Sequence, residues 1–291
     1  MSVAGVENRG ARPGAAQLAL MVSAFCWGCS WWPYRQLEAL GLHPLWATCF
    51  VFGLASIGLT LRRRGAWREL LSQPALLAMA LASGLSAAAF NWAVTIGDVV
   101  RVVLMFYLMP VWSLLLARWL LGERFGPRAL PRLAAALAGV AIVLRPEGGG
   151  WPLPATPAEL LGLVGGFAYA LASVLMRREA ARSVTARALA VMGGSTLAAA
   201  ALALAFQVPL PPGFDPIWLG GVVALTLVFL LSNVAYQYGV VRLPAAVSSL
   251  VMLTEVLFAS GSAMLLGAGD FSLRVAAGAA LILGAGLVRS R

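Results

Sequence analysis

Long apolar segments, separated by short stretches that carry arginine, are the feature that most limits how this chain can fold. In the segment 99–121, no charged residue occurs from Val102 to Ala117, and Leu120-Leu121-Gly122-Glu123-Arg124 closes it. A helix needs about 20 apolar residues to cross a hydrocarbon core of roughly 30 Å. Pro110, near the middle, lacks a backbone N–H and should bend the helix. We therefore predict a kinked membrane-spanning helix here.

The rest of the chain has the same character. It is 61% hydrophobic and 11% charged, whereas soluble domains are about half apolar. We predict an all-α membrane protein with ten transmembrane helices. The predicted spans are 17–35, 43–61, 74–95, 99–121, 128–145, 157–176, 187–207, 216–238, 244–267 and 272–288.

The arginines indicate the topology. All 21 basic residues are arginine, and if the N-terminus is cytoplasmic, 17 of them fall in inner segments and 4 in outer ones. Cytoplasmic loops are enriched in basic residues, so both termini should lie on the cytoplasmic side of a bacterial inner membrane. The net charge of +10 is then a product of topology and does not indicate a nucleic-acid partner. We expect no removable signal peptide, because the first apolar run lacks a cleavage signature.

The two halves of the chain resemble each other. Phe25-Cys26-Trp27 through Arg35 matches Phe167-Ala168-Tyr169 through Arg177 at an offset of 142 residues, and Asn91 matches Asn233 at the same offset. Chance similarity among helices rich in Ala, Leu and Gly is the alternative. Because the matches include Asn, Arg and aromatic positions, we favour a repeat.

A repeat divides the chain into four parts. We predict a cytoplasmic tail at 1–16, a first five-helix repeat at 17–145, an outer linker at 146–156 and a second repeat at 157–291. Since five is odd, the second repeat must enter the membrane from the opposite side. Inverted repeats are typical of secondary transporters, in which similar halves of opposite orientation open a midplane site alternately.

Several motifs carry a family resemblance. Trp27-Gly28, Pro110-Val111 followed by Leu120 to Arg124, and an arginine-rich second inner loop resemble the EamA-like branch of the drug/metabolite transporter superfamily. Residues 106–110 and 167–169 are most similar to bacterial aromatic amino-acid exporters of the YddG type. The resemblance implies export of aromatic and other neutral or hydrophobic amino acids by alternating access, and no enzymatic activity. Efflux of another small metabolite or drug is the alternative.

A midplane substrate site should combine aromatic rings with a few polar groups. Rings can stack on an amino-acid side chain, while Asn amides and Tyr hydroxyls can bind its charged backbone groups. We predict six substrate-binding residues: Trp27, Asn91, Tyr107, Tyr169, Asn233 and Tyr236.

Other roles stay open for some of these residues. Asn91 and Asn233 could instead join helices by hydrogen bonds. For Trp31, Trp32 and Tyr34 we favour an interfacial aromatic belt over the site.

Helical spacing also defines faces that could line the site. On the third predicted span, Ser83, Ser86 or Ala87, and Asn91 align; on the sixth, Gly162, Gly166, Tyr169 and Ser173 align.

Glu255 is the acidic residue that we place deep within a span, where a carboxylate costs several kcal/mol unless it is paired, protonated or exposed to a cavity. The Leu-Leu-Gly triplets ending at Gly122 and Gly267 recur at an offset of 145, which makes Glu255 equivalent to Pro110. We predict coupling or gating roles for both, with Glu255 responding to protons or amines. A protonated, hydrogen-bonded structural glutamate is the alternative.

No motif predicts a cofactor or a metal. Cys26-x-x-Cys29 has metal-ligand spacing, but it lies in an apolar helix without a second ligand pair, and His43 is the single histidine. Glu123, at the inner boundary, should be an anchor or a gate that pairs with an arginine. The expected partners are small amino acids, with protons as candidate coupling ions, and the lipid bilayer. We expect a monomer rather than a dimer.

Overall fold

The structure is a computed structural model that describes residues 13–123, 129–145, 156–211 and 215–266, with isolated positions at 154, 213, 273–274, 276–278 and 280–281. Within these residues the chain is all-helical and has no strand. Residues 1–12, Arg124, most of the predicted linker 146–156, Gly267 and most of the predicted span 272–288 lie outside the described residues.

The first half of the chain forms eight of the described helices. They are α1 (Pro13–Gly28), α2 (Trp31–Ala39), α3 (Pro44–Arg62), α4 (Ala66–Ser72), α5 (Pro74–Ile96), α6 (Val99–Phe106), α7 (Met109–Leu121) and α8 (Ala129–Leu144). The second half forms α9 (Pro157–Arg178), α10 (Val184–Ala205), α11 (Pro216–Val240), α12 (Ala245–Met252) and α13 (Thr254–Leu265).

Five of the described helices, α3, α5, α9, α10 and α11, are long and apolar enough to cross a membrane. They match the predicted spans 43–61, 74–95, 157–176, 187–207 and 216–238 to within a few residues. α11 exposes Leu227, Leu231 and Val234 along one face, an arrangement that suits contact with lipid. The helical prediction is confirmed for these segments.

The predicted bend at Pro110 is confirmed as a break between α6 and α7 at Tyr107 and Leu108, with Pro110 in the first turn of α7. A proline cannot donate to the carbonyl four residues earlier, which here belongs to Phe106. Gly166 of α9 packs directly against that carbonyl. Without a side chain at 166, α9 can cover the backbone that the break leaves free.

The prediction of one helix at 17–35 is wrong, because α1 ends at Gly28 and α2 begins at Trp31. Pro33 explains the break, since it cannot donate to the carbonyl of Cys29. The predicted span 244–267 is also divided, into α12 and α13 on either side of Leu253. No proline causes that break; Leu253 and Val256 instead make three-residue hydrogen bonds to Leu250 and Leu253.

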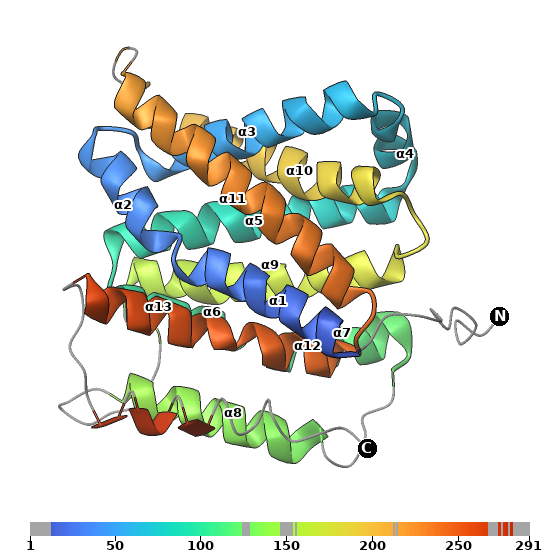
Figure 1. Ribbon diagram of the computed structural model, residues 1–291, viewed down its shortest axis with the longest axis vertical. Coiled ribbons are helices and arrows are strands. Elements are labelled where there is room, and N and C mark those ends of the chain that lie inside the picture. Colours follow the sequence, from blue (N-terminus) through green and yellow to red (C-terminus); the bar gives the residue numbers. More distant parts are fainter. Residues whose placement is uncertain are drawn as a thin grey trace.

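The helices pack around a centre bounded by α1, α5, α9, α10 and α11 (Figure 1). α5 lies between α9 and α10, while α1 packs on α11 and α13. Gly84 and Gly194 allow the α5 and α10 backbones to touch, because a Cβ on Gly194 would meet the carbonyl of Ala80. α8 contacts α6 at the edge of the bundle. α4 is a short helix where the sequence predicted only an inner loop.

Candidate functional site

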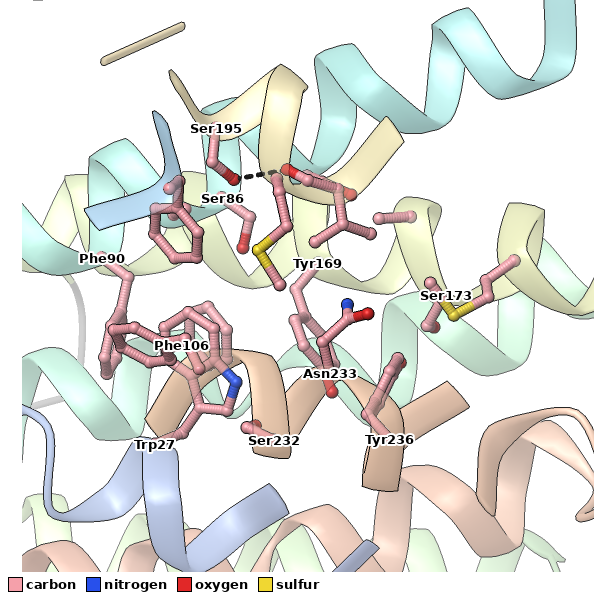
Figure 2. Close-up of a pocket in the computed structure, with 18 of the residues that line it drawn as sticks. Trp27, Ser86, Phe90, Phe106, Tyr169, Ser173, Ser195, Ser232, Asn233 and Tyr236 are labelled. Atoms are coloured by element: carbon pink, nitrogen blue, oxygen red, sulfur yellow. Dashed lines mark hydrogen bonds between the residues drawn. The ribbon is translucent and has the colours of Figure 1, made fainter. Parts of the chain in front are cut away.

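A cavity lies among these helices, with about 750 Å³ of space between the side chains, part of which is open to solvent. The residues that line it come from α1, α3, α5, α6, α9, α10, α11 and α13 (Figure 2). They are Trp27, Phe52, Ser83, Ser86, Ala87, Phe90, Phe106, Tyr169, Ala172, Ser173, Met176, Val191, Met192, Ser195, Phe229, Ser232, Asn233, Tyr236 and Glu255.

One side of the cavity is aromatic. In Figure 2, Trp27, Phe90 and Phe106 gather at this side. The ring of Phe90 lies 6.3 Å from that of Trp27 and 4.8 Å from that of Phe106, and Phe229 lies 4.5 Å from Trp27. Aromatic pairs prefer such centroid separations of about 4.5–7 Å. The rings form a connected apolar wall against which a planar or hydrophobic group can pack.

The other side is more polar. Tyr169, Asn233, Tyr236 and Ser173 lie together there in Figure 2. The rings of Tyr169 and Tyr236 are 5.8 Å apart. The Tyr169 hydroxyl is buried and interacts electrostatically with Tyr236, yet it forms no hydrogen bond of ordinary geometry with the residues that the structure describes. It is therefore available for a hydrogen bond with a bound solute.

Asn233 is held in place by its own helix. Its Oδ1 accepts a hydrogen bond of 2.7 Å from Nε2 of Gln237, one turn further along α11. The residue before Asn233, Ser232, shares a buried hydrogen bond of 2.9 Å with Ser23, and this bond joins α11 to α1. The amide of Asn233 thus lies in the cavity wall in a fixed orientation.

Glu255 also lines the cavity, from the first turn of α13. The residue is 3% exposed. Its side chain interacts electrostatically with the hydroxyls of Tyr107 and Tyr169. Because Tyr107 is fully buried, it contacts the carboxylate from the side that faces away from the cavity. The helix N-terminus beneath Glu255 favours a negative charge there.

The structure brings most of the predicted site residues together. Five of them line the cavity: Trp27, Tyr169, Asn233, Tyr236 and Glu255. Tyr107 lies behind Glu255 and is not part of the lining; its hydroxyl is 3.4 Å from the carbonyl of Met252. Pro110 marks the break that ends α6 close to this point.

Asn91 lies in a separate polar cluster. Its Nδ2 donates to the hydroxyl of Tyr34 at 2.9 Å and to Oγ1 of Thr48 at 3.0 Å, and it is 1% exposed. These bonds join α5 to α2 and α3, which is the helix-joining alternative that the sequence left open. The belt expectation is wrong for Tyr34, which is fully buried, and for Trp31, whose indole donates to Ser262.

Of the residues on the two predicted helix faces, some line the cavity and others pack against neighbouring helices. On α9, Tyr169 and Ser173 line the cavity, whereas Gly162 and Gly166 pack on the backbone of α6. On α5, Ser83 and Ser86 both line it. The contributions of α3, of α10 and of the phenylalanines could not be predicted from the sequence, because Phe, Met and Val are common across the predicted spans.

A second, smaller cavity adjoins the first through Tyr169, Ser173 and Tyr236, and its lining extends to Arg177 and Met252. Arg177 forms an ion pair with Glu123, which follows α7. At the opposite end of α9, Glu159 pairs with Arg101 of α6 at 3.2 Å. Each end of α9 is therefore joined by a charged contact to the broken helix α6–α7, and Glu123 has the arginine partner that we expected for an anchor or gate.

The segment between α3 and α5 is fixed to the start of α10. Oγ and the backbone N–H of Ser183 both donate to the Glu69 carboxylate, at 2.6 and 2.9 Å. These bonds lower the pKa of Glu69 below its ordinary value near 4.5. They join α4 to the end of the bundle that also carries the Glu123–Arg177 pair.

Apolar helices around a mixed aromatic and polar cavity define a multi-pass membrane protein. Residues 14–145, somewhat less than half of the chain, match the model of the EamA-like transporter family. A solved crystal structure superimposes with a TM-score of 0.69 over 94% of this chain and 95% of that chain, at 21% identity, and thus shares the fold. No curated protein matches the sequence.

Proposed function

We propose that this protein is a secondary transporter that exports aromatic and other neutral, hydrophobic amino acids across a bacterial inner membrane. The observation that carries the proposal is the division of the cavity. An apolar wall of Trp27, Phe90 and Phe106 suits an aromatic side chain, and the adjoining part of the lining offers Tyr169 and Asn233 to the polar groups of an amino acid. Such a division orients a solute that is apolar at one end and polar at the other.

The same division also sets a limit on the cargo. Among the described residues, none that lines the cavity is Arg, Lys or His. A carboxylate would therefore be bound by neutral donors alone, whereas an anionic cargo would ordinarily require a cationic partner. This favours zwitterionic over purely anionic solutes.

We infer ten spans in two inverted repeats, 17–145 and 157–291, with both termini inside. Two observations support this. The order of helices recurs, with α9, α10, α11 and α12–α13 following in the second half as α1–α2, α3, α5 and α6–α7 do in the first. The breaks also correspond, because Leu108 and Leu253 are 145 residues apart and both α6 and α12 have eight residues. In this topology, Arg177 and Glu123 lie at the cytoplasmic end.

The protein should transport its substrate by alternating access, and it should act as a monomer. The ion pair between Glu123 and Arg177 lies at the small cavity that adjoins the central one, because Arg177 is part of the lining of that small cavity. We propose that this pair closes the inner entrance and separates when the site faces the cytoplasm. Helices broken near the cavity, such as α6–α7, provide places where the bundle can bend.

Uptake into proteoliposomes tests the proposal. Purified protein should accumulate labelled phenylalanine saturably, with competition by unlabelled phenylalanine and less by a cationic dye. Replacing Trp27 by alanine should raise the KM for phenylalanine by about tenfold, because an aromatic contact worth on the order of 1.5 kcal/mol is lost. Trp32→Ala is the matched control, since Trp32 lies outside the cavity and is 44% exposed.

The outcomes separate the candidate functions. Competition by the dye alone would exclude amino-acid export and favour efflux of another metabolite or drug. No saturable flux of either compound would contradict the transporter. If Trp27→Ala and Trp32→Ala changed the KM for phenylalanine equally, the cavity would not be the substrate-binding site.

A further inference from the structure

Glu255 places a buried carboxylate in the wall of the central cavity without a basic partner. The residue is 3% exposed and belongs to none of the ion pairs formed among the described residues. An ionised carboxylate removed from water is costly unless a proton or a cation neutralises it. Because none of the described residues supplies that cation, a proton or a bound cation can fill this role.

The helices packed around Glu255 supply hydroxyls and rings instead of charge. Tyr107, which directly follows α6, and Tyr169 of α9 both interact electrostatically with the carboxylate. Tyr236 of α11 lines the same cavity. α1 contributes the Trp27 ring and Cys26, and neither α1, α11 nor α12 contains a charged residue. The charged residues of α9 lie at its two ends, where Glu159 and Arg177 are paired.

We propose that Glu255 is a subsite for the ammonium group of the substrate. A primary ammonium forms an ion pair and hydrogen bonds with the carboxylate, and it displaces the proton that otherwise neutralises it. The Tyr107 hydroxyl positions the carboxylate from behind. The faces of Trp27, Phe106 and Tyr169, which line the same cavity, can attract the cation further. The assignment builds on the proposed function and specifies which end of the cargo is recognised.

One ammonium ion replaces one proton at Glu255. When the empty site holds a protonated carboxyl, binding of one ammonium ion breaks one O–H bond and releases one proton to water. No covalent bond to the ligand forms. The ammonium and the proton are alternative occupants, so amine binding should weaken as the pH falls. A protein that binds one on each side of the membrane would exchange amine for proton.

Three compounds of similar shape test the subsite. Each has a phenyl ring: L-phenylalanine has both polar groups, 2-phenylethylamine lacks the carboxylate, and 3-phenylpropionate lacks the ammonium. We would measure their affinities by calorimetry on the full chain in lipid nanodiscs at pH 5.5 and 8. Phenylethylamine should bind about tenfold more tightly at pH 8, and phenylpropionate should not bind. In weakly buffered solution at pH 5.5, each bound amine should release about one proton.

Glu255→Gln keeps the size and hydrogen-bonding groups of the side chain but not the charge. It should weaken phenylethylamine binding by on the order of 100-fold and abolish the difference between the two pH values. Glu179→Gln is the matched control, because Glu179 pairs with Arg182 outside the cavity. If Glu255→Gln does not fold, proton release by the unaltered protein still decides the question.

The results distinguish this subsite from the proposed function. If phenylalanine is transported but phenylethylamine does not bind, or binds without proton release, the subsite is wrong and the transporter stands. The subsite is also wrong if Glu255→Gln keeps the pH dependence. If phenylethylamine binds as described and phenylalanine is not transported, amino-acid export is wrong and the protein recognises amines of another class.

Discussion

At the scale of single residues, Gly28 determines how closely α1 approaches the helix that carries Glu255. A Cβ at this position would lie 2.7 Å from the carbonyl oxygen of Glu255 and 2.8 Å from Cβ of Phe258. Both atoms belong to the first part of α13 and neither is the flexible end of a side chain. The absence of a side chain at 28 therefore brings Trp27 and Glu255 into one cavity.

Gly28→Ala should consequently destabilise the protein by about 1–3 kcal/mol, the usual cost of overpacking. It should also weaken solute binding, because α1 and α13 must separate. Thermal unfolding in detergent and calorimetry would measure the two effects. Gly58→Ala is the control, since nothing lies within 4 Å of a Cβ at 58 in α3 and alanine favours helix. If the two variants were equally stable, α1 and α13 could separate enough for the added methyl group without a loss of stability.

Residue chemistry also explains which of the predicted site residues line the cavity. Trp27 and Tyr169 are 142 residues apart, the offset at which the two halves of the sequence resemble each other, and both line the cavity. Asn91 and Asn233 correspond equally well, but Asn91 is bound by Tyr34 and Thr48, whereas Asn233 reaches the cavity. An amide inside a span needs partners in either case. Its residue type could not show whether neighbouring helices or a solute supply them.

At the scale of helices, proline is the most informative sequence signal. Pro110 and Pro33 each leave the carbonyl four residues earlier without its helical hydrogen bond, and the helix is interrupted near both. The sequence predicts the first break but not the second, because Pro33 lies near the end of its predicted span. The break at Leu253 had no local signal, and the repeat alone could have indicated it. Apolar length sufficed for helices such as α5 and α11.

The junction of α4 with α10 should depend on pH. Because the bonds from Ser183 lower the pKa of Glu69, their stabilisation is fully present above about pH 4.5 and is lost as the pH falls through the lower value of the folded protein. Glu69 is largely open to solvent, so the loss should be below about 1 kcal/mol. Unfolding of the protein and of Glu69→Gln, measured from pH 3 to 7, should converge at the acidic end. Curves that stay parallel would contradict this linkage.

The ion pair between Glu123 and Arg177 should control entry at the end of α9. Neutralising either partner, as in Glu123→Gln, should expose the central cavity, which can be read from labelling of Ser173→Cys by a polar thiol reagent. Ser173 lines both cavities. The three native cysteines would first be replaced by alanine. We expect labelling to be several-fold faster.

The opposite pair supplies the control for this experiment. Arg101→Gln separates α6 from Glu159 at the other end of α9 and should not admit reagent added from the cytoplasmic side. Reversal of the charges at 123 and 177 together should restore slow labelling. If Glu123→Gln leaves the rate unchanged, the pair is a structural anchor.

At the scale of the whole molecule, the arrangement makes a definite topological prediction. Five described helices can cross a membrane by their length and composition, and the charge bias of the sequence orients them. With both termini inside, the segment between α3 and α4 faces the cytoplasm and the segment before α11 faces outward. Helices that cross in a fixed order must place Gly65 and Gly213 on opposite sides.

These two glycines are a matched pair, because a Cβ would meet nothing within 4 Å at either position. Gly65→Cys and Gly213→Cys, each in a chain without other cysteines, should therefore fold alike. In intact cells, a reagent that cannot cross the inner membrane should label residue 213 and leave residue 65 unlabelled until the cells are broken. The reverse pattern would invert the topology and move the Glu123–Arg177 pair to the outer entrance. Labelling of both from outside would mean that the number of spans between α3 and α11 is not odd, because an odd number is what separates the two positions across the membrane.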